Sequence, residues 1–188
     1  MKFFKLGLVS IAVATSLFAG NYNIDASHTN AGFTVKHMMI TNVTGKFNDI
    51  AGSFEFDEKT KTLKSINGEI ISASIDTANE KRDEHLKAPE LFDVAQFPKI
   101  TFKSTKIEKD KVYGELTMKG VTKTVVLDLE TSDVIKDPWG KQRTGLSLNG
   151  KIKRSDFGIT WNKALETGGV AVSDEVKLSV DMEGILAN

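Results

Sequence analysis

Three polar side chains that can take part in chemistry lie close together near the middle of the chain. Arg82 can bind an anion, while Asp83 and His85 can act as an acid and a base. The apolar residues Leu91 and Phe92 follow within ten residues. Polar groups beside an apolar rim suit a ligand with a charged head and a hydrocarbon tail. The alternative is a helix that closes one end of the fold and leaves its charges solvated.

A second group, Asp25, Ser27 and His28, has the residue types of a catalytic triad. Ser27 and His28 are adjacent, however, and adjacent residues of a strand point to opposite faces. The glycine pattern of a nucleophile elbow is also missing from the sequence. We therefore predict no catalytic residues here.

Metal and phosphate chemistry have no local signal in the sequence. The chain holds three histidines, His28, His37 and His85, and none stands at a spacing typical of paired metal ligands. No glycine-rich phosphate loop leads from a strand into a helix. We predict no metal site and no required cofactor.

The stretch with Arg82 interrupts a pattern of short strands. Its period changes and its charge density rises, which predicts one helix from Ala78 to about Ala88. Thr77 or Asp76 can cap the start of this helix through a side-chain oxygen. Pro89 ends it, because the residue before a proline avoids the α region. Such an interruption of a strand pattern favours a lid or a mouth.

Alternation of apolar and polar residues predicts about eight to nine strands joined by short turns. An antiparallel sandwich or closed barrel in one domain follows, and about eight strands leave room for side chains or one small ligand. Periodicity does not decide whether the interior is filled or hollow. The alternating stretches on which this prediction rests are residues 21–25, 33–38, 43–47, 53–56, 66–75, 100–102, 112–118, 122–130, 146–152 and 176–182.

Residues 1–19 have the pattern of a cleaved secretory signal. Lys2 and Lys5 precede an apolar run from Leu6 to Phe18, and this run is too short to cross a bilayer. We place cleavage after Ala19, which leaves residues 20–188 as a single mature domain. The sequence predicts no membrane span in that domain and a periplasmic location, with extracellular release as the alternative.

Composition excludes some classes of protein. The signal holds two of the 25 basic residues and none of the 25 acidic ones, so the mature chain is slightly acidic. This balance argues against a nucleic-acid partner. The chain has no cysteine, so it needs no disulfide in an oxidising compartment. About 170 residues bury enough surface to fold without one.

The order of several short motifs resembles the YceI-like family of secreted, lipocalin-like proteins. These motifs run from Tyr22 to Val180, nearly the whole mature chain. Family members often have two adjacent phenylalanines within the block from Ser74 to Thr105. In this chain Leu91 replaces the first of them, and Phe92 is the second. The matching motifs are Y-x-I-D-x-S-H (22–28), F-x-V-K-H (33–37), G-x-F (45–47), the block from Ser74 to Thr105, G-E-L-T-M-K-G-V-T-K (114–123), R-x-D-F-G (154–158) and V-S-D-x-V (172–176).

The resemblance implies an all-β fold, an eight-stranded antiparallel lipocalin-like barrel with one short helical segment near one end. It also implies a long apolar tunnel for an isoprenoid or another amphiphilic lipid, and binding rather than catalysis, and such proteins are often homodimers. The candidate residues for the apolar wall are Phe33, Phe47, Phe54, Phe56, Phe92, Phe102 and Leu116. The candidate contacts for the polar head are Lys36, His37, Arg82 and His85.

Two other functions remain open from the sequence. One is an enzyme acting on a lipophilic substrate, with Asp83 and His85 as acid and base. The other is a barrel filled by its own side chains that serves as a protein-interaction module.

Overall fold

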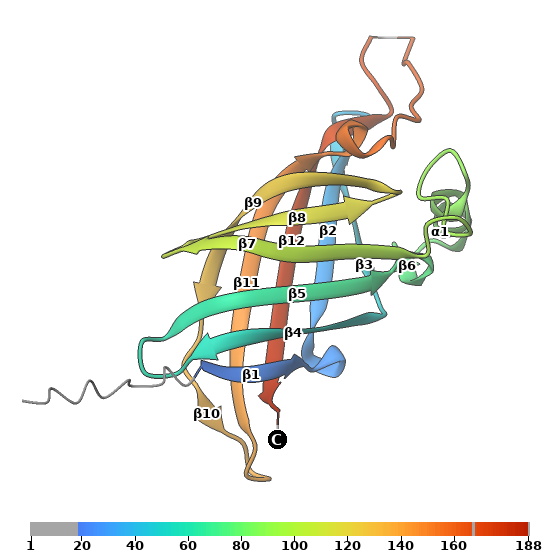
Figure 1. Cartoon of the computed structure of the whole chain (residues 1–188). Coiled ribbons are helices and arrows are strands. Elements are labelled where there is room, and N and C mark those ends of the chain that lie inside the picture. Colours follow the sequence, from blue (N-terminus) through green and yellow to red (C-terminus); the bar gives the residue numbers. More distant parts are fainter. Residues whose placement is uncertain (1–18, 167, 188) are drawn as a thin grey trace, which may run out of the picture.

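The computed structural model describes residues 19–166 and 168–187. Within these ranges one antiparallel sheet curls into a closed barrel, and α1 lies at one end of it (Figure 1). The strands are β1 (Ala19–Ile24), β2 (Asn30–His37), β3 (Thr41–Phe47), β4 (Ile50–Asp57), β5 (Thr62–Ile71), β6 (Ile75–Asp76), β7 (Lys99–Glu108), β8 (Lys111–Met118), β9 (Val121–Thr131), β10 (Ile135–Lys136), β11 (Gln142–Lys153) and β12 (Val172–Leu186). The helices are α1 (Glu80–Lys87) and the short 3₁₀ segments η1 (Ala26–His28), η2 (Ser72–Ser74) and η3 (Arg154–Phe157).

In the described ranges these strands occupy eight positions around the barrel. β1 with β2, β3 with β4, and β5 with β6 are each one broken barrel strand, because β1 pairs with β4 while β2 pairs with β3, and β4 pairs with β5 while β3 pairs with β6. The order then continues through β7, β8, β9 and β11 to β12. β12 closes the ring by pairing with β11 on one side and with β1 and β2 on the other. The predicted eight-stranded antiparallel barrel is confirmed.

Alternation along β8 shows why these residues form barrel strands. Val112, Leu116 and Met118 point inward and are buried, while Lys111 and Glu115 point to solvent. One face of each strand therefore removes apolar surface from water, and the other keeps charged groups hydrated. The same period of two was visible in the sequence.

One part of the barrel interior is filled by aromatic and aliphatic side chains. Tyr22 stacks on Phe54 with ring centroids 5.4 Å apart and meets Phe56 edge-on at 6.4 Å. All three rings are at most 1% exposed. The Tyr22 hydroxyl donates a hydrogen bond of 2.8 Å to Glu58 Oε1, and burial together with this carboxylate raises the pKa of the tyrosine. This packed cluster leaves no room for a ligand around these rings.

The helix α1 is shorter at its start than we predicted. Ala78 has a positive φ of 57°, and its N–H donates to Asp76 Oδ1. Asn79 is the residue that caps the helix, accepting a hydrogen bond of 3.0 Å from the Arg82 N–H. The prediction of Thr77 or Asp76 as the cap was therefore wrong, because both side chains bond elsewhere. The predicted end at Ala88, before Pro89, is confirmed.

Candidate functional site

Two apolar cavities lie in the barrel interior. The outer cavity, about 320 Å³, lies beneath α1 and the segment that follows η3. The inner cavity, about 140 Å³, lies among inward-facing side chains of the barrel strands. Five side chains line both cavities, so the two share one wall; they are Phe33, Phe47, Met118, Ile152 and Leu178. The barrel is therefore filled in one part and hollow in another.

A chain of aromatic rings runs along the shared wall toward α1. Phe33 and Phe47 lie 5.8 Å apart, and Phe47 meets Phe92 edge-on at 5.9 Å. Phe33 lies over Gly45, its cross-strand partner, where a Cβ would come within 2.4 Å of the ring. The lack of a side chain at Gly45 thus gives the Phe33 ring its place between the cavities.

The seven predicted wall residues divide between cavity and core. Phe33, Phe47 and Phe92 line the outer cavity, and Phe102 and Leu116 line the inner one. Phe54 and Phe56 line neither cavity, because they pack on Tyr22 in the filled part of the barrel. Alternation places a side chain inside a barrel but does not say whether another side chain already fills the space opposite.

The predicted polar residues also divide. His37, Arg82 and His85 lie on the outer cavity. Lys36 is exposed and does not line it, because it is adjacent to His37 on β2 and points to the other face.

Arg82 and Asp83 fasten the start of α1 to the buried Thr77. Asp83 Oδ1 accepts hydrogen bonds from the Thr77 N–H at 2.9 Å and the Thr77 hydroxyl at 2.5 Å. Arg82 donates through Nε to the same hydroxyl oxygen at 2.7 Å and through a terminal nitrogen to the Thr77 carbonyl at 2.8 Å. We call these three residues the Thr77 clamp. In this clamp the Asp83 carboxylate has a structural role, because it holds Thr77 against α1.

His85 lies next to this clamp on α1 but has other partners. Its Nε2 is 3.2 Å from Glu90 Oε1, and its ring meets Trp161 edge-on at 4.8 Å. Within residues 19–166 and 168–187, no hydrogen bond joins Asp83 to His85. Asp83 and His85 therefore have separate partners, Thr77 for the carboxylate and Glu90 with Trp161 for the imidazole.

The segment after η3 supplies wall residues that the sequence analysis missed. Ile159 and Trp161 line the outer cavity, and neither was among the predicted wall residues. Arg154 holds this segment in place: it is 7% exposed and donates to the carbonyl oxygens of Ser173, Ile159 and Trp161 at 2.8–3.0 Å. Burial lowers the pKa of Arg154. Irregular backbone has no period, so only the R-x-D-F-G motif marked this segment as special.

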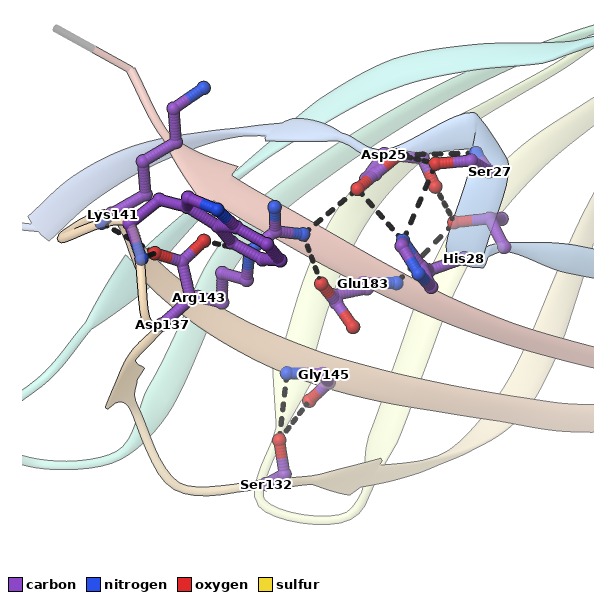
Figure 2. A network of polar contacts seen from close by, with 11 residues as sticks. Asp25, Ser27, His28, Ser132, Asp137, Lys141, Arg143, Gly145 and Glu183 are labelled. Carbon is purple, nitrogen blue, oxygen red and sulfur yellow. Dashed lines mark hydrogen bonds and ion pairs between the residues drawn. The ribbon is translucent and has the colours of Figure 1, made fainter.

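The triad-like residues do meet, contrary to our expectation, in the polar network of Figure 2. Ser27 and His28 lie on η1, which Asp25 caps, rather than on a strand, so the argument from opposite faces was wrong. Asp25 accepts from the Ser27 hydroxyl at 2.5 Å, and its other oxygen lies 3.0 Å from His28 Nδ1. The serine thus bonds to the carboxylate directly, whereas a triad needs the imidazole between them.

Arg143 joins three carboxylates in this network. It contacts Asp25 at 2.9 Å and Asp137 at 2.7 Å, and it also pairs with Glu183. Hydrogen bonds from Ser27, His28 and Arg143 hold the pKa of Asp25 well below its usual range. The donor atoms of Asp25, His28 and Glu183 lie within 4.8 Å of one another. The Arg143 guanidinium already balances the negative charge of these carboxylates. The network therefore has a structural explanation.

Comparison with known proteins agrees with this fold. A model of the YceI-like domain matches residues 22–184. A UPF0312 protein of Staphylococcus aureus strain N315 is 38% identical over 164 residues, which cover 87% of this chain and 96% of the relative. The crystal structure of a Campylobacter jejuni YceI protein is 32% identical and superposes with a TM-score of 0.71 over all of both chains.

A more distant solved structure shares the fold. It is a polyisoprenoid binding domain from Saccharophagus degradans, 14% identical, with a TM-score of 0.67 over 90% of this chain and all of that domain. Among the residues that the structure describes, no helix is long and apolar enough to cross a membrane. From its match over nearly the whole barrel, this chain belongs to the YceI-like family.

Proposed function

We propose that this chain binds an isoprenoid or a similar amphiphilic lipid in its two apolar cavities and carries it in the periplasm. The observation that carries the proposal is the pair of cavities with a shared apolar wall inside a closed barrel. The polyisoprenoid binding of the Saccharophagus degradans domain, which has the same fold, supports a ligand of this class. The predicted signal at residues 1–19 supports the compartment.

The cavities provide enough apolar burial for binding without catalysis. The outer cavity falls in the size range of small-molecule sites, roughly 300–1,000 Å³. Burying about ten methylene groups gains on the order of 8 kcal/mol, from which association and ordering subtract several. The polar head then lies at the end near α1, where His37, Arg82 and His85 line the cavity. The hydrocarbon tail extends past Phe33 and Phe47 toward the inner cavity.

Native mass spectrometry of mature protein purified without detergent tests the proposal. We expect an adduct of lipid mass that persists in the intact protein and dissociates on denaturation. Protein that stays free of ligand after a challenge with a farnesyl- or geranylgeranyl-bearing lipid contradicts the proposal. The same spectra give the stoichiometry of the protein and so test the homodimer that the family resemblance implies.

A further inference from the structure

The turn between β2 and β3 exposes three consecutive large apolar side chains. Met38 is 42% exposed, Met39 57% and Ile40 80%. We call residues 38–40 the apolar tip. The other tight hairpin turns that the structure describes, at 58–61, 109–110 and 119–120, contain charged residues, as solvated turns commonly do. Exposed apolar clusters of this kind mark sites of interaction with proteins or membranes.

The backbone of the apolar tip makes the choice of methionine unusual. Met38 and Met39 have φ values of 48° and 62°, and the Ile40 N–H closes the turn on the His37 carbonyl at 3.1 Å. Two consecutive left-handed residues in a hairpin turn strongly favour Asn-Gly, because a larger side chain is strained there. The chain thus keeps two apolar side chains at a position where they weaken the turn. This is expected where the side chains serve an interaction.

The apolar tip lies at the rim of the outer cavity. The Met38 N–H donates to the Ala171 carbonyl at 2.8 Å, and His37 pairs with Val172. His37, Ala171 and Val172 all line the outer cavity. In Figure 1 the light-blue turn between β2 and β3 lies beside the orange segment that follows η3, at the end of the barrel opposite β10. Whatever the tip contacts is therefore brought next to the cavity.

The chemistry of this hairpin end fits a lipid surface with negative charge. From Thr34 to Thr44 the sequence has no acidic residue, and Lys36 is exposed beside the tip. The tip is rich in methionine, whose flexible side chains adapt to a soft apolar medium. Apolar side chains next to a basic group are the combination that inserts into the interface of an anionic bilayer.

We propose that the apolar tip inserts into the surface of an anionic bilayer and holds the outer cavity against the membrane from which the lipid is taken. This inference rests on the proposed lipid binding, because it identifies where the ligand is loaded. It adds an interaction surface that the cavity itself does not require. A protein that only sequestered dispersed lipid would have no use for an apolar tip.

The test uses a variant that removes the apolar surface and should improve the turn. Met38→Asn, Met39→Gly and Ile40→Thr together give the turn sequence that left-handed residues favour, so we expect an unchanged or higher Tm. The matched control carries Ile135→Thr and Trp139→Ser, which remove exposed apolar side chains at the β10 end. Both are compared with the mature wild-type protein.

Flotation with phosphatidylethanolamine and phosphatidylglycerol vesicles measures membrane binding. We expect the tip variant to lose at least about tenfold in partitioning and the control to keep wild-type partitioning, because three exposed side chains lose their apolar burial. A dansyl-labelled farnesyl probe, added in a soluble form, is expected to bind both proteins equally. Uptake of the same probe from the vesicles is expected to slow at least about tenfold in the tip variant only.

The outcomes separate this inference from the proposed function. Wild-type protein that binds the soluble probe but does not float with vesicles overturns the membrane inference alone. Protein that binds no probe overturns the proposed function, whatever the flotation shows. A tip variant that changes from dimer to monomer and keeps its vesicle partitioning assigns the tip to a second copy of the chain and overturns the inference as well.

Discussion

Replacement of Thr77 by valine tests whether the Thr77 clamp holds α1 in place. The substitution keeps the size and the β-branch but removes the hydroxyl that donates to Asp83 and accepts from Arg82. Thr77 is 6% exposed, so water does not replace the lost partners. Loss of a buried hydroxyl from such a network costs about 1–3 kcal/mol. A central loss of about 2 kcal/mol lowers the Tm of a domain of this size by roughly 4–8 °C.

Differential scanning calorimetry measures this change, and Thr124→Val is the matched control. Thr124 is exposed on β9, where valine suits a strand, so its Tm should stay within about 1 °C of wild type. Hydrogen exchange of the α1 amides gives a local readout, because a weakened clamp lets the helix open more often. A Thr77→Val protein with wild-type Tm and unchanged α1 exchange would refute the view that these hydrogen bonds fasten the helix.

Three further predictions concern the cavities and the polar network. Leu178→Trp places a large ring where the two cavities meet and should weaken binding of a farnesyl probe at least about tenfold in a titration. The control Val126→Trp, on the outer face of the barrel, should bind the probe as the wild type does. Gly45→Ala should lower the free energy of unfolding in urea by about 1–3 kcal/mol, because the new Cβ meets the Phe33 ring at 2.4 Å. The control Gly68→Ala should lower it by less than about 1 kcal/mol, because its Cβ meets no atom within 4 Å. Equal losses would show that ring displacement is not the cause. The low pKa of Asp25 stabilises the folded state at pH above about 4 and loses its effect as the pH falls below that value, so the stability gap between wild type and Asp25→Asn should be largest near pH 7 and shrink in acid unfolding curves. A gap that stays constant down to pH 2 would contradict this account.

Sequence patterns predicted the strands of the barrel because the burial of one face of a strand depends on residues close together in the sequence. In β8 the alternation of Val112, Leu116 and Met118 with charged residues requires one buried face, and that requirement is met wherever the strand sits in the sheet. The helix end at Pro89 is equally local. The family resemblance added the number of strands and the position of the helix, which alternation alone left between a sandwich and a barrel.

The division of the interior into filled and hollow parts depends on contacts across the barrel. Phe33 and Phe54 are each followed by one polar and then one apolar residue, but only Phe54 stacks on Tyr22. The polar network of Figure 2 likewise depends on Arg143, which is 118 residues from Asp25 in the chain. Neither of these contacts between distant residues can be inferred from a short window of sequence. The cavity wall at Trp161 was missed for a related reason, because its segment has no regular period.

The long strand β12 has a consequence for how the protein is made. It pairs with β11 along one edge and with both β1 and β2 along the other, so it joins the two ends of the sheet into a closed ring. Until this strand has emerged during synthesis, the preceding strands can form only a sheet with two exposed edges, which favour aggregation. The barrel therefore closes only after its last strand is delivered, and chaperones that shield open sheet edges should matter most in that interval.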